Sequence, residues 1–286
     1  MARLQSGKHA PRLFKQWRFD LLNAFSPKIS EQIYALWDEL ADFDAAQTEA
    51  SRTRLLEGLC SLAGAQDATW IGAVRMGDPM PGDPVGGWRP KVFHYLRDPA
   101  TRTRINKPRI EALESRQVDA TIIRNVSMAG RFRVNRLVDL VDGTWFDGDY
   151  YRSYYLGFGH HDAIWVGIPI NEDAESYFGL YRAIGTPAFS ESDCAVVGHA
   201  LRGITWFHRQ QMLGEGLHVA SEPLTPLERR VLQGLLQGLM DKEIAAELGQ
   251  SPYTAQEYVK RIFRKYGVSS RTALMALWLG RTNPRS

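Results

Sequence analysis

The last quarter of the 286-residue chain constrains the fold most, because helix start and stop signals follow one another there at close spacing. Residues 225–228 read Thr-Pro-Leu-Glu. The Thr can cap a helix, the Pro lacks an N–H where none is needed, and the Glu completes a capping box. Apolar residues from Leu227 to Leu239 predict a helix that runs to Gln237, and Gly238 can end it.

Two further helices are expected, with a short turn between them. The first begins at a capping Asp241 and ends at Gly249, which supplies a left-handed residue. The next begins with Ser251 as cap and Pro252 at its first position, and it ends at Gly267. This spacing is typical of a helix-turn-helix.

Polar side chains of this third predicted helix recur every three or four residues, so they share one exposed surface with Lys265 at its edge. They are Tyr253, Gln256, Glu257, Lys260, Arg261 and Arg264. Gln can pair with adenine, and Lys and Arg can reach guanine or phosphate. A solvated helix face is the alternative, but the caps and the turn favour an element that reads double-stranded DNA.

The run from Leu224 to Gly280 resembles the DNA-binding domain of LuxR-type regulators nearly end to end. Four matching segments carry the resemblance: Leu224–Glu228, Lys242–Ala245, Ser251–Thr254 and Lys265–Arg271. The family likeness implies structural roles for Glu243 and Leu248. It also implies that Thr254 and Lys260 face the DNA backbone and that Gln256 and Glu257 read bases.

Three residues depart from the family pattern. Gln256 stands where Lys is usual, Tyr258 where His is common, and Tyr253 where Arg is frequent. These changes reduce positive charge at the groove, which implies an unusual target or weaker binding by the isolated domain. Glu257 is either a cytosine contact or a residue that rejects other sites.

Charge and composition agree with a two-part regulator. The chain carries a net charge of +3, and residues 222–286 hold ten basic against six acidic residues. The excess therefore lies with the predicted DNA reader, as phosphate neutralisation requires. No run of about 18 apolar residues appears, so we expect a cytoplasmic protein with no membrane association. Cys60 and Cys194 lack a paired-Cys motif and are expected to be buried thiols.

The first 215 residues predict an α+β domain. Two helical patterns follow Ser30. The first helix is expected to turn Ile33, Leu36, Trp37 and Leu40 inward, and the second Leu55, Leu56, Leu59 and Leu62. Strands are expected at 69–76, 91–96, 163–170 and 176–183, the last two as a hairpin. A capped helix should then run from Ser190 to Leu213.

The stretch from Ile168 to Leu201 resembles GAF domains and their PAS-like relatives. The shared features are a strand ending in Pro169-Ile170, a polar turn, a strand with Gly179-Leu180, and a Phe-Ser-Glu-x-Asp helix start. The resemblance implies an α/β/α sandwich with an antiparallel sheet that either binds a small effector or serves only for dimerisation or docking. Both roles stay open.

The expected organisation has four parts: an N-terminal arm (1–29), a sensor and dimerisation domain (30–213), a linker (214–223) and the four-helix DNA-binding domain (224–286). Gly214 and Gly216 would make the linker pliable. Two-fold DNA sites call for a homodimer, paired through the helix ending at Leu213 and the last helix, Thr272 to Leu279.

Aromatic residues crowd residues 145–155 and suggest an effector pocket. The candidate ligand-binding residues are Trp70, Phe93, Trp145, Tyr150, Tyr154 and Trp165. The alternative is that these rings fill the core. Residues 97–136 hold ten basic against four acidic residues. They could bind an anionic effector, lie along DNA backbone, or form a solvated helical face, which the pattern favours.

Other functional classes find little support in the sequence. His160-His161-Asp162 are consecutive, so their side chains cannot easily converge on a metal, and no second cluster completes a site. No nucleophile, phosphate-loop or paired-carboxylate motif appears, so we predict no enzyme, cofactor or metal. The sequence lacks the acidic cluster that a phospho-receiver domain needs. The sequence also lacks the Trp and Tyr spacing that is characteristic of acyl-homoserine-lactone receptors, so this class stays a weaker alternative.

Overall fold

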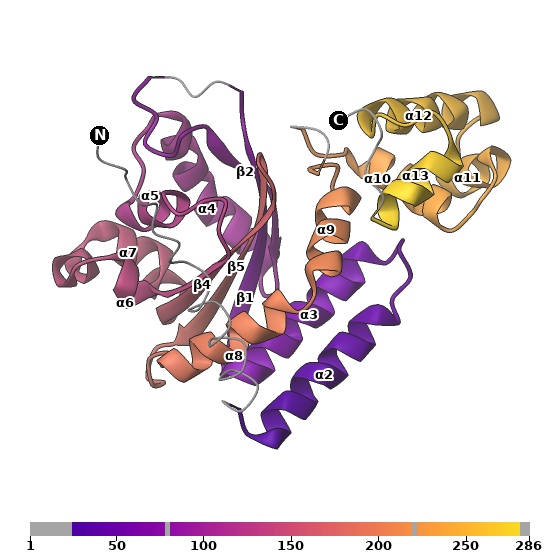
Figure 1. The fold of residues 1–286 in the computed structure, drawn as a ribbon. Helices are drawn as coiled ribbons and strands as arrows, with labels where there is room; N and C mark the ends of the chain where they lie inside the picture. The colour runs from indigo at the N-terminus through magenta and orange to yellow at the C-terminus, as the bar shows by residue number, and fades with distance from the viewer. Residues whose placement is uncertain (1–24, 78–80, 219–221, 281–286) are drawn as a thin grey trace, which may run out of the picture.

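The computed structural model describes residues 25–77, 81–218 and 222–280 of the protein. An antiparallel sheet with helices on both faces forms the N-terminal part, and a bundle of helices forms the C-terminal part (Figure 1). The α+β prediction is therefore confirmed. The expected arm lies mostly outside the described residues, and the first domain begins before residue 30, because Ser26 caps a helix that starts at Pro27.

The sheet has five strands in the order β2-β1-β5-β4-β3, all antiparallel. Their bounds are β1 (Asp67–Arg75), β2 (Trp88–Tyr95), β3 (Arg133–Arg136), β4 (His160–Asn171) and β5 (Ala174–Ala183). The predicted hairpin of β4 and β5 is confirmed. Its strands are longer than expected, because Asn171 already accepts the N–H of Asp173 and closes the turn within two residues. The short strand β3 had no sequence signal.

One face of the sheet is covered by helices that build the main core. They are α2 (Pro27–Ala41), α3 (Thr48–Ala63), α8 (Glu191–Arg202) and α9 (Thr205–Gly214). The predicted inner faces of α2 and α3 are largely confirmed, and only Trp37 and Leu62 are half-buried. These helices cover the sheet on the side where the C-terminal part lies (Figure 1).

The single long helix predicted from Ser190 to Leu213 is wrong, because the chain breaks between α8 and α9. The Trp37 indole N–H donates to the Ala200 carbonyl at 2.8 Å, which removes the acceptor that Ile204 would use in a continuous helix. The Trp37 ring also lies against Gly203, where a Cβ atom would come within 2.3 Å of it. Packing against α2 thus overrides the local helical pattern.

The other face of the sheet is covered by one long helix and several short elements, none of which the sequence resolved. They are α4 (Pro99–Glu114), α5 (Ala120–Val126), α6 (Leu137–Leu140), α7 (Asp149–Tyr154) and two 3₁₀ turns at Gly143–Asp147 and Leu156–Phe158. A cluster of aromatic rings from α7 and its neighbours packs against β4 and β5. This layer creates the cavity described below.

The C-terminal part consists of α10 (Pro226–Leu236), α11 (Asp241–Leu248), α12 (Pro252–Lys265) and α13 (Arg271–Trp278). The capping box of Thr225 and Glu228 and the left-handed Gly249 are confirmed. The expectation that Asp241 caps α11 is wrong. Glu243 accepts the Met240 N–H instead, and Asp241 pairs with Arg271 at 2.5 Å.

The linker is packed in its described residues, contrary to the expected pliable tether. Gly214 is the last residue of α9, where a Cβ would meet Thr48 at 2.7 Å. Gly216 has φ +80°, the left-handed conformation that favours glycine, and it turns the chain after α9. Leu224 then donates its N–H to the Glu215 carbonyl at 2.9 Å. The two parts are therefore docked on each other.

Candidate DNA-binding face and ligand pocket

The second helix of the helix-turn-helix, α12, presents its predicted polar face to solvent. Ala255, Val259 and Ile262 are buried on its inner side. The outer side chains are exposed at Tyr253, Gln256, Lys260, Arg261 and Arg264, and partly exposed at Thr254 and Glu257. The exposed fraction of Tyr253 is 73%. An amphipathic helix that carries cations on its outer face suits a DNA groove.

An ion pair organises the middle of this face. The Lys260 ammonium lies 2.8 Å from the Glu257 carboxylate, and this contact lowers the pKa of Glu257 and raises that of Lys260. The Arg261 guanidinium lies 5.0 Å from the centre of the Tyr258 ring. Because the pair is exposed, it can exchange for phosphate or base contacts at small cost.

Lys265 differs from the other predicted DNA contacts. Its ammonium pairs at 2.8 Å with Glu228, whose side chain is almost completely buried. Burial opposes ionisation of Glu228, but the bonds from Lys265 and Thr225 outweigh it and lower the pKa. Lys265 therefore ties α12 to the start of α10, and the sequence pattern alone could not separate this role from DNA contact.

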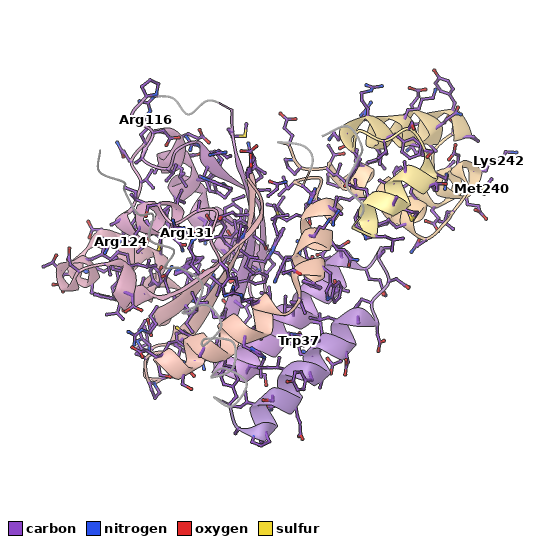
Figure 2. All side chains as sticks on the ribbon, viewed as in Figure 1. Trp37, Arg116, Arg124, Arg131, Met240 and Lys242 are labelled. Atoms are coloured by element: carbon purple, nitrogen blue, oxygen red, sulfur yellow. The ribbon has the colours of Figure 1, made fainter. Side chains whose placement is uncertain are left out.

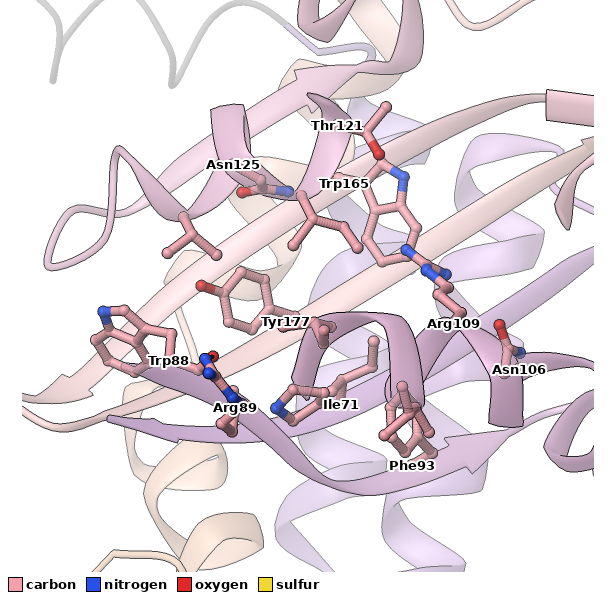
Figure 3. Close-up of a pocket in the computed structure, with 16 residues that line it drawn as sticks. Ile71, Trp88, Arg89, Phe93, Asn106, Arg109, Thr121, Asn125, Trp165 and Tyr177 are labelled. Atoms are coloured by element: carbon pink, nitrogen blue, oxygen red, sulfur yellow. Dashed lines mark hydrogen bonds between the residues drawn. The ribbon is translucent and has the colours of Figure 1, made fainter. Parts of the chain in front are cut away.

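A cavity of about 90 Å³ lies between the sheet and helices α4 and α5 (Figure 3). This is several times the space that one water molecule requires. Most of the wall is apolar and comes from Ile71, Ala73, Trp88, Pro90, Phe93, Ile110, Leu113, Ile122, Val126, Trp165 and Tyr177. The polar lining consists of Arg89, Asn106, Arg109, Thr121 and Asn125.

Of the six predicted ligand-binding residues, Phe93 and Trp165 line this cavity. The expectation that Trp70 joins them is wrong, because it lies on the opposite face of the sheet, where its indole donates to Ser176 at 2.6 Å. Trp145, Tyr150 and Tyr154 are also outside the lining. They belong to the aromatic cluster beside α7, which matches the alternative that these rings fill a core.

One end of the cavity is closed by a buried ionic network. Arg133 pairs with Glu175 through two hydrogen bonds of 3.0 and 2.8 Å, and it also donates to Tyr177 and Asn125. A Cβ atom at Gly167 would come within 2.4 Å of this guanidinium. Strand β3 and helix α5 are therefore fixed to the sheet by satisfied charges.

Arg109 supplies the charged group at the other end of the cavity. Its guanidinium lies 5.4 and 5.8 Å from the ring centres of Tyr150 and Tyr154. Burial lowers its pKa, but the tyrosine oxygens and the Asp119 carboxylate outweigh this and raise it, so the group stays charged. The Asp119 carboxylate itself caps α5 and accepts the Trp145 indole N–H at 2.9 Å. In the described part of the chain, no hydrogen bond or ion pair joins Arg109 to a carboxylate.

The Arg-rich segment 97–136 does not form one basic surface. Arg102 is buried in an ion pair with Asp67, and Arg133 pairs with Glu175. Figure 2 shows Arg116, Arg124 and Arg131 on the side of the molecule away from the helix-turn-helix, which carries Met240 and Lys242. The idea that this segment follows DNA beside α12 is therefore not supported by the arrangement.

The His160-His161-Asp162 run has structural roles. His160 stacks on Tyr181 with ring centres 4.9 Å apart, and burial followed by the charge of Arg102 lowers its pKa to about 4. Asp162 accepts the Phe189 N–H at 2.7 Å. Among the described residues, no group of three or more potential ligands could hold a metal ion. None of the helices described is long and apolar enough to cross a membrane.

A second cavity, of about 150 Å³, lies where the two parts of the chain meet. Glu215 is the centre of this junction, because its carboxylate accepts from Arg52 at 2.7 Å and from Arg229 at 3.1 Å. Arg52 is buried, packs 4.0 Å from the centre of the Trp70 ring, and also donates to Gln211. The junction thus links α3, the end of α9 and α10.

The junction extends to the helix-turn-helix core. Leu213 at the end of α9 is buried in the hydrophobic cluster of the C-terminal part. Its carbonyl accepts a hydrogen bond from the buried Tyr266 hydroxyl. Arg209 further donates to the Leu277 carbonyl at 3.3 Å. No sequence signal marked Glu215, Arg52 or Tyr266 for this role, because the partners lie far apart in the chain.

Comparison with known proteins supports the class of the C-terminal part. Residues 222–278 match the model of the bacterial regulatory proteins of the luxR family. Response regulator Rre1 of Synechocystis sp. (strain ATCC 27184 / PCC 6803 / Kazusa) is 45% identical over 64 residues, which cover 21% of this chain and 28% of Rre1. UhpA of Escherichia coli (strain K12) is 47% identical over 53 residues, covering 18% and 27%. The C-terminal part is a LuxR-family helix-turn-helix domain.

The shared region is limited to that domain, since the chain spans less than a third of the length of these relatives. Among solved structures, Escherichia coli SdiA aligns over 87% of this chain and 96% of its own, with a TM-score of 0.40 and 14% identity. The VqsR LBD domain from Pseudomonas aeruginosa aligns over 66% and 98%, with a TM-score of 0.37 and 12% identity.

Proposed function

We propose that the protein is a sequence-specific, DNA-binding transcriptional regulator. The exposed outer face of α12, in a domain of the LuxR family, is the observation that carries this proposal. Gln256 and Glu257 are assigned to base contacts, and Thr254, Lys260, Arg261 and Arg264 to the phosphate backbone or guanine. Tyr253 flanks them at the start of the helix. The role needs no catalysis and no cofactor, and it belongs in the cytoplasm, where the DNA is.

We further propose that the N-terminal domain, residues 27–214, binds a small effector in the cavity between the sheet and helices α4 and α5. The combination of an apolar wall with a few polar groups is typical of ligand sites. The GAF/PAS-like character inferred from the sequence agrees with this use. Phe93 and Trp165 are the ligand contacts that both the sequence and the cavity favour.

A physical route connects this cavity with the DNA-binding domain. Phe93 lines both the effector cavity and the junction cavity, and its neighbour His94 contacts the Thr53 hydroxyl at 3.0 Å. Thr53 is adjacent to Arg52, which holds Glu215. We propose that an effector changes the position of β2 and thereby the docking of α10 at Glu215, which controls the DNA-binding domain. Control of this kind requires two arrangements of the junction with different effector affinities.

Binding to two-fold DNA sites favours a homodimer. Sedimentation velocity at micromolar concentration, with and without operator DNA, tests this part of the proposal. A monomer under both conditions contradicts it.

The experiment for the function as a whole has two arms. Native mass spectrometry of protein purified from its own host should show a retained compound, or one that binds on addition of host extract. DNase footprinting on the promoters of the same host should show a protected site whose occupancy changes with that compound. A protected site without any bound compound would instead favour a ligand-free dimerisation or docking module.

A further inference from the structure

The effector cavity contains a charged group that has no carboxylate partner among the residues the structure describes. Two arginines line it, and only one of them is neutralised. Arg89 lies 3.1 Å from Asp83 and 3.3 Å from Glu114, so its charge is matched. Arg109 has tyrosine rings beside it but, in the residues that the structure describes, no paired carboxylate.

The neighbours of Arg109 leave its hydrogen-bond donors available. The ring faces of Tyr150 and Tyr154 stabilise a cation without accepting its N–H groups. Asp119, whose charge helps to raise the pKa of Arg109, already accepts from the Thr121 backbone and hydroxyl and from Trp145. The surrounding oxygens stabilise the charge of Arg109 from a distance, but guanidinium N–H donors without an acceptor in a largely apolar cavity are unfavourable unless a ligand or water satisfies them.

Polar groups around the cavity favour a single negative charge on the ligand. Asn106 spends its amide N–H groups on Tyr95 and on the Arg102 carbonyl, which leaves its oxygen as an acceptor. Asn125 uses its oxygen for Arg133, which leaves its amide nitrogen as a donor. A single guanidinium without a carboxylate partner among the described residues suits one carboxylate, whereas a phosphate dianion would call for more cations.

The remaining wall fixes the rest of the ligand. Figure 3 shows Trp165 beside Arg109, with Ile71, Phe93 and Tyr177 along the cavity. Side chains of this kind bury an alkyl chain or an aryl ring and exclude water. A carboxylate in such a site forms strong charge-assisted, bidentate bonds with Arg.

We infer that the effector is an anionic amphiphile, a small carboxylate with an alkyl or aryl body, and that the Arg109 guanidinium binds its carboxylate. This inference rests on the proposed effector function of the same cavity and specifies its ligand class. Trp165 and Phe93 contact the apolar body, and Asn125, at the opposite end of the cavity, is left for the far end of the ligand.

The test compares acids with their neutral amides on the full-length protein. Isothermal titration calorimetry is performed with two pairs of probes, octanoate against octanamide and 4-phenylbutanoate against 4-phenylbutanamide. The inference expects the acid of at least one pair to bind about ten-fold more tightly than its amide, since one charge-assisted bond contributes this much. In Arg109→Gln this preference should disappear while the amide affinity is retained, and Arg109→Lys should keep part of it.

Arg104→Gln is the matched control, because Arg104 is on the same helix but exposed. It should bind all four probes as the wild type does. Circular dichroism and thermal melting check that the Arg109 variants are folded, and the amide affinity provides a second check within the same cavity.

Three results overturn the inference. They are equal or tighter binding of the amides, an acid preference that survives in Arg109→Gln, and no binding of either acid at millimolar concentration. The first two leave effector sensing intact and reject only the carboxylate. Failure of the proposed function itself would appear separately, as the absence of any retained host compound together with operator binding that no host extract changes.

Discussion

Replacement of Glu215 by Ala should separate the two domains more effectively than any surface substitution. The Glu215 carboxylate neutralises Arg52, whose side chain is only 3% exposed, and it also binds Arg229. Burial lowers the pKa of Arg52 and the charge of Glu215 opposes this, so the arginine loses its main support in the variant. Removing one partner of a buried pair costs about 3–5 kcal/mol.

Two contacts reduce this cost in the present case. Arg52 keeps its 2.8 Å hydrogen bond to Gln211 and its position over the Trp70 ring. We therefore expect the lower end, about 3 kcal/mol. The pair of Glu215 with the half-exposed Arg229 adds less than about 1 kcal/mol, because solvent screens it.

Hydrogen exchange measured by mass spectrometry provides the assay, because two docked domains need not unfold in a single step. The Leu224 N–H, which donates to the Glu215 carbonyl, reports the junction. Its peptide should exchange about 100-fold faster in Glu215→Ala, which is about 3 kcal/mol of lost protection. The β4–β5 peptides should change little.

Arg229→Gln is the matched control for Glu215→Ala. It removes the exposed partner and leaves the buried pair intact, so protection at Leu224 should fall by less than about five-fold. Equal protection in Glu215→Ala and the wild type would refute the reasoning that this carboxylate holds the domains together. Equal loss in both variants would show that Arg229, rather than Arg52, carries the contact.

The remaining predictions concern packing and pH. Gly203→Ala should cost about 1–3 kcal/mol of hydrogen-exchange protection at the β4–β5 peptides, because its Cβ would clash with Trp37. Gly143→Ala, which has open space around it, should leave this protection unchanged, and equal effects of the two variants would contradict the packing argument. Burial lowers the pKa of His160, with help from Arg102, and that of His208 to about 4 in the folded protein. The unfolded chain therefore binds more protons than the folded protein below about pH 6.5. As the pH falls from about 6.5 to about 4, each of these histidines should lower the free energy of unfolding by about 1.4 kcal/mol per pH unit. In His208→Gln, the melting temperature should decrease less steeply as the pH is lowered than it does in the wild type. An unchanged slope would exclude this histidine as a cause of the pH dependence.

The C-terminal domain could be predicted from sequence nearly to its helix ends, because its signals are local. A capping box, a left-handed glycine and a three-residue turn each depend on residues close in the chain. Even there, the spacing of Lys265 matches the exposed face and predicts a DNA contact, which stays a prediction. The ion pair of Lys265 with Glu228 joins residues 37 positions apart, so no periodicity could indicate it.

The N-terminal domain could be predicted only in class. The hairpin of β4 and β5 is marked by two strand-like runs separated by a polar turn. Helices α4 and α5 carry only a weak apolar pattern, and the cavity walls that they form have no sequence signal. The aromatic density near Tyr150 suggested a pocket, but aromatic residues fill cores equally well. Which face of β1 Trp70 occupies depends on the strand register, and the sequence did not fix it.

The long helix was predicted wrongly for a similar reason. Its heptad-like apolar pattern continues through Gly203, and only the Trp37 indole, from a helix more than 160 residues earlier, interrupts the hydrogen bonds. The linker shows the same limit. Its glycines suggested flexibility, but Gly214 is the point where α9 approaches Thr48 most closely.

The central claim is that the outer face of α12 reads DNA, and fluorescence anisotropy on a footprinted operator at several salt concentrations tests it most directly. Lys260→Ala should weaken binding to operator and unrelated DNA alike and reduce the slope of log K against log salt by about one. Gln256→Ala should keep that slope and change which base is preferred at one operator position, with a cost of about 1–3 kcal/mol on the original sequence. Equal effects of the two variants on every sequence, or wild-type binding by both, would contradict the account.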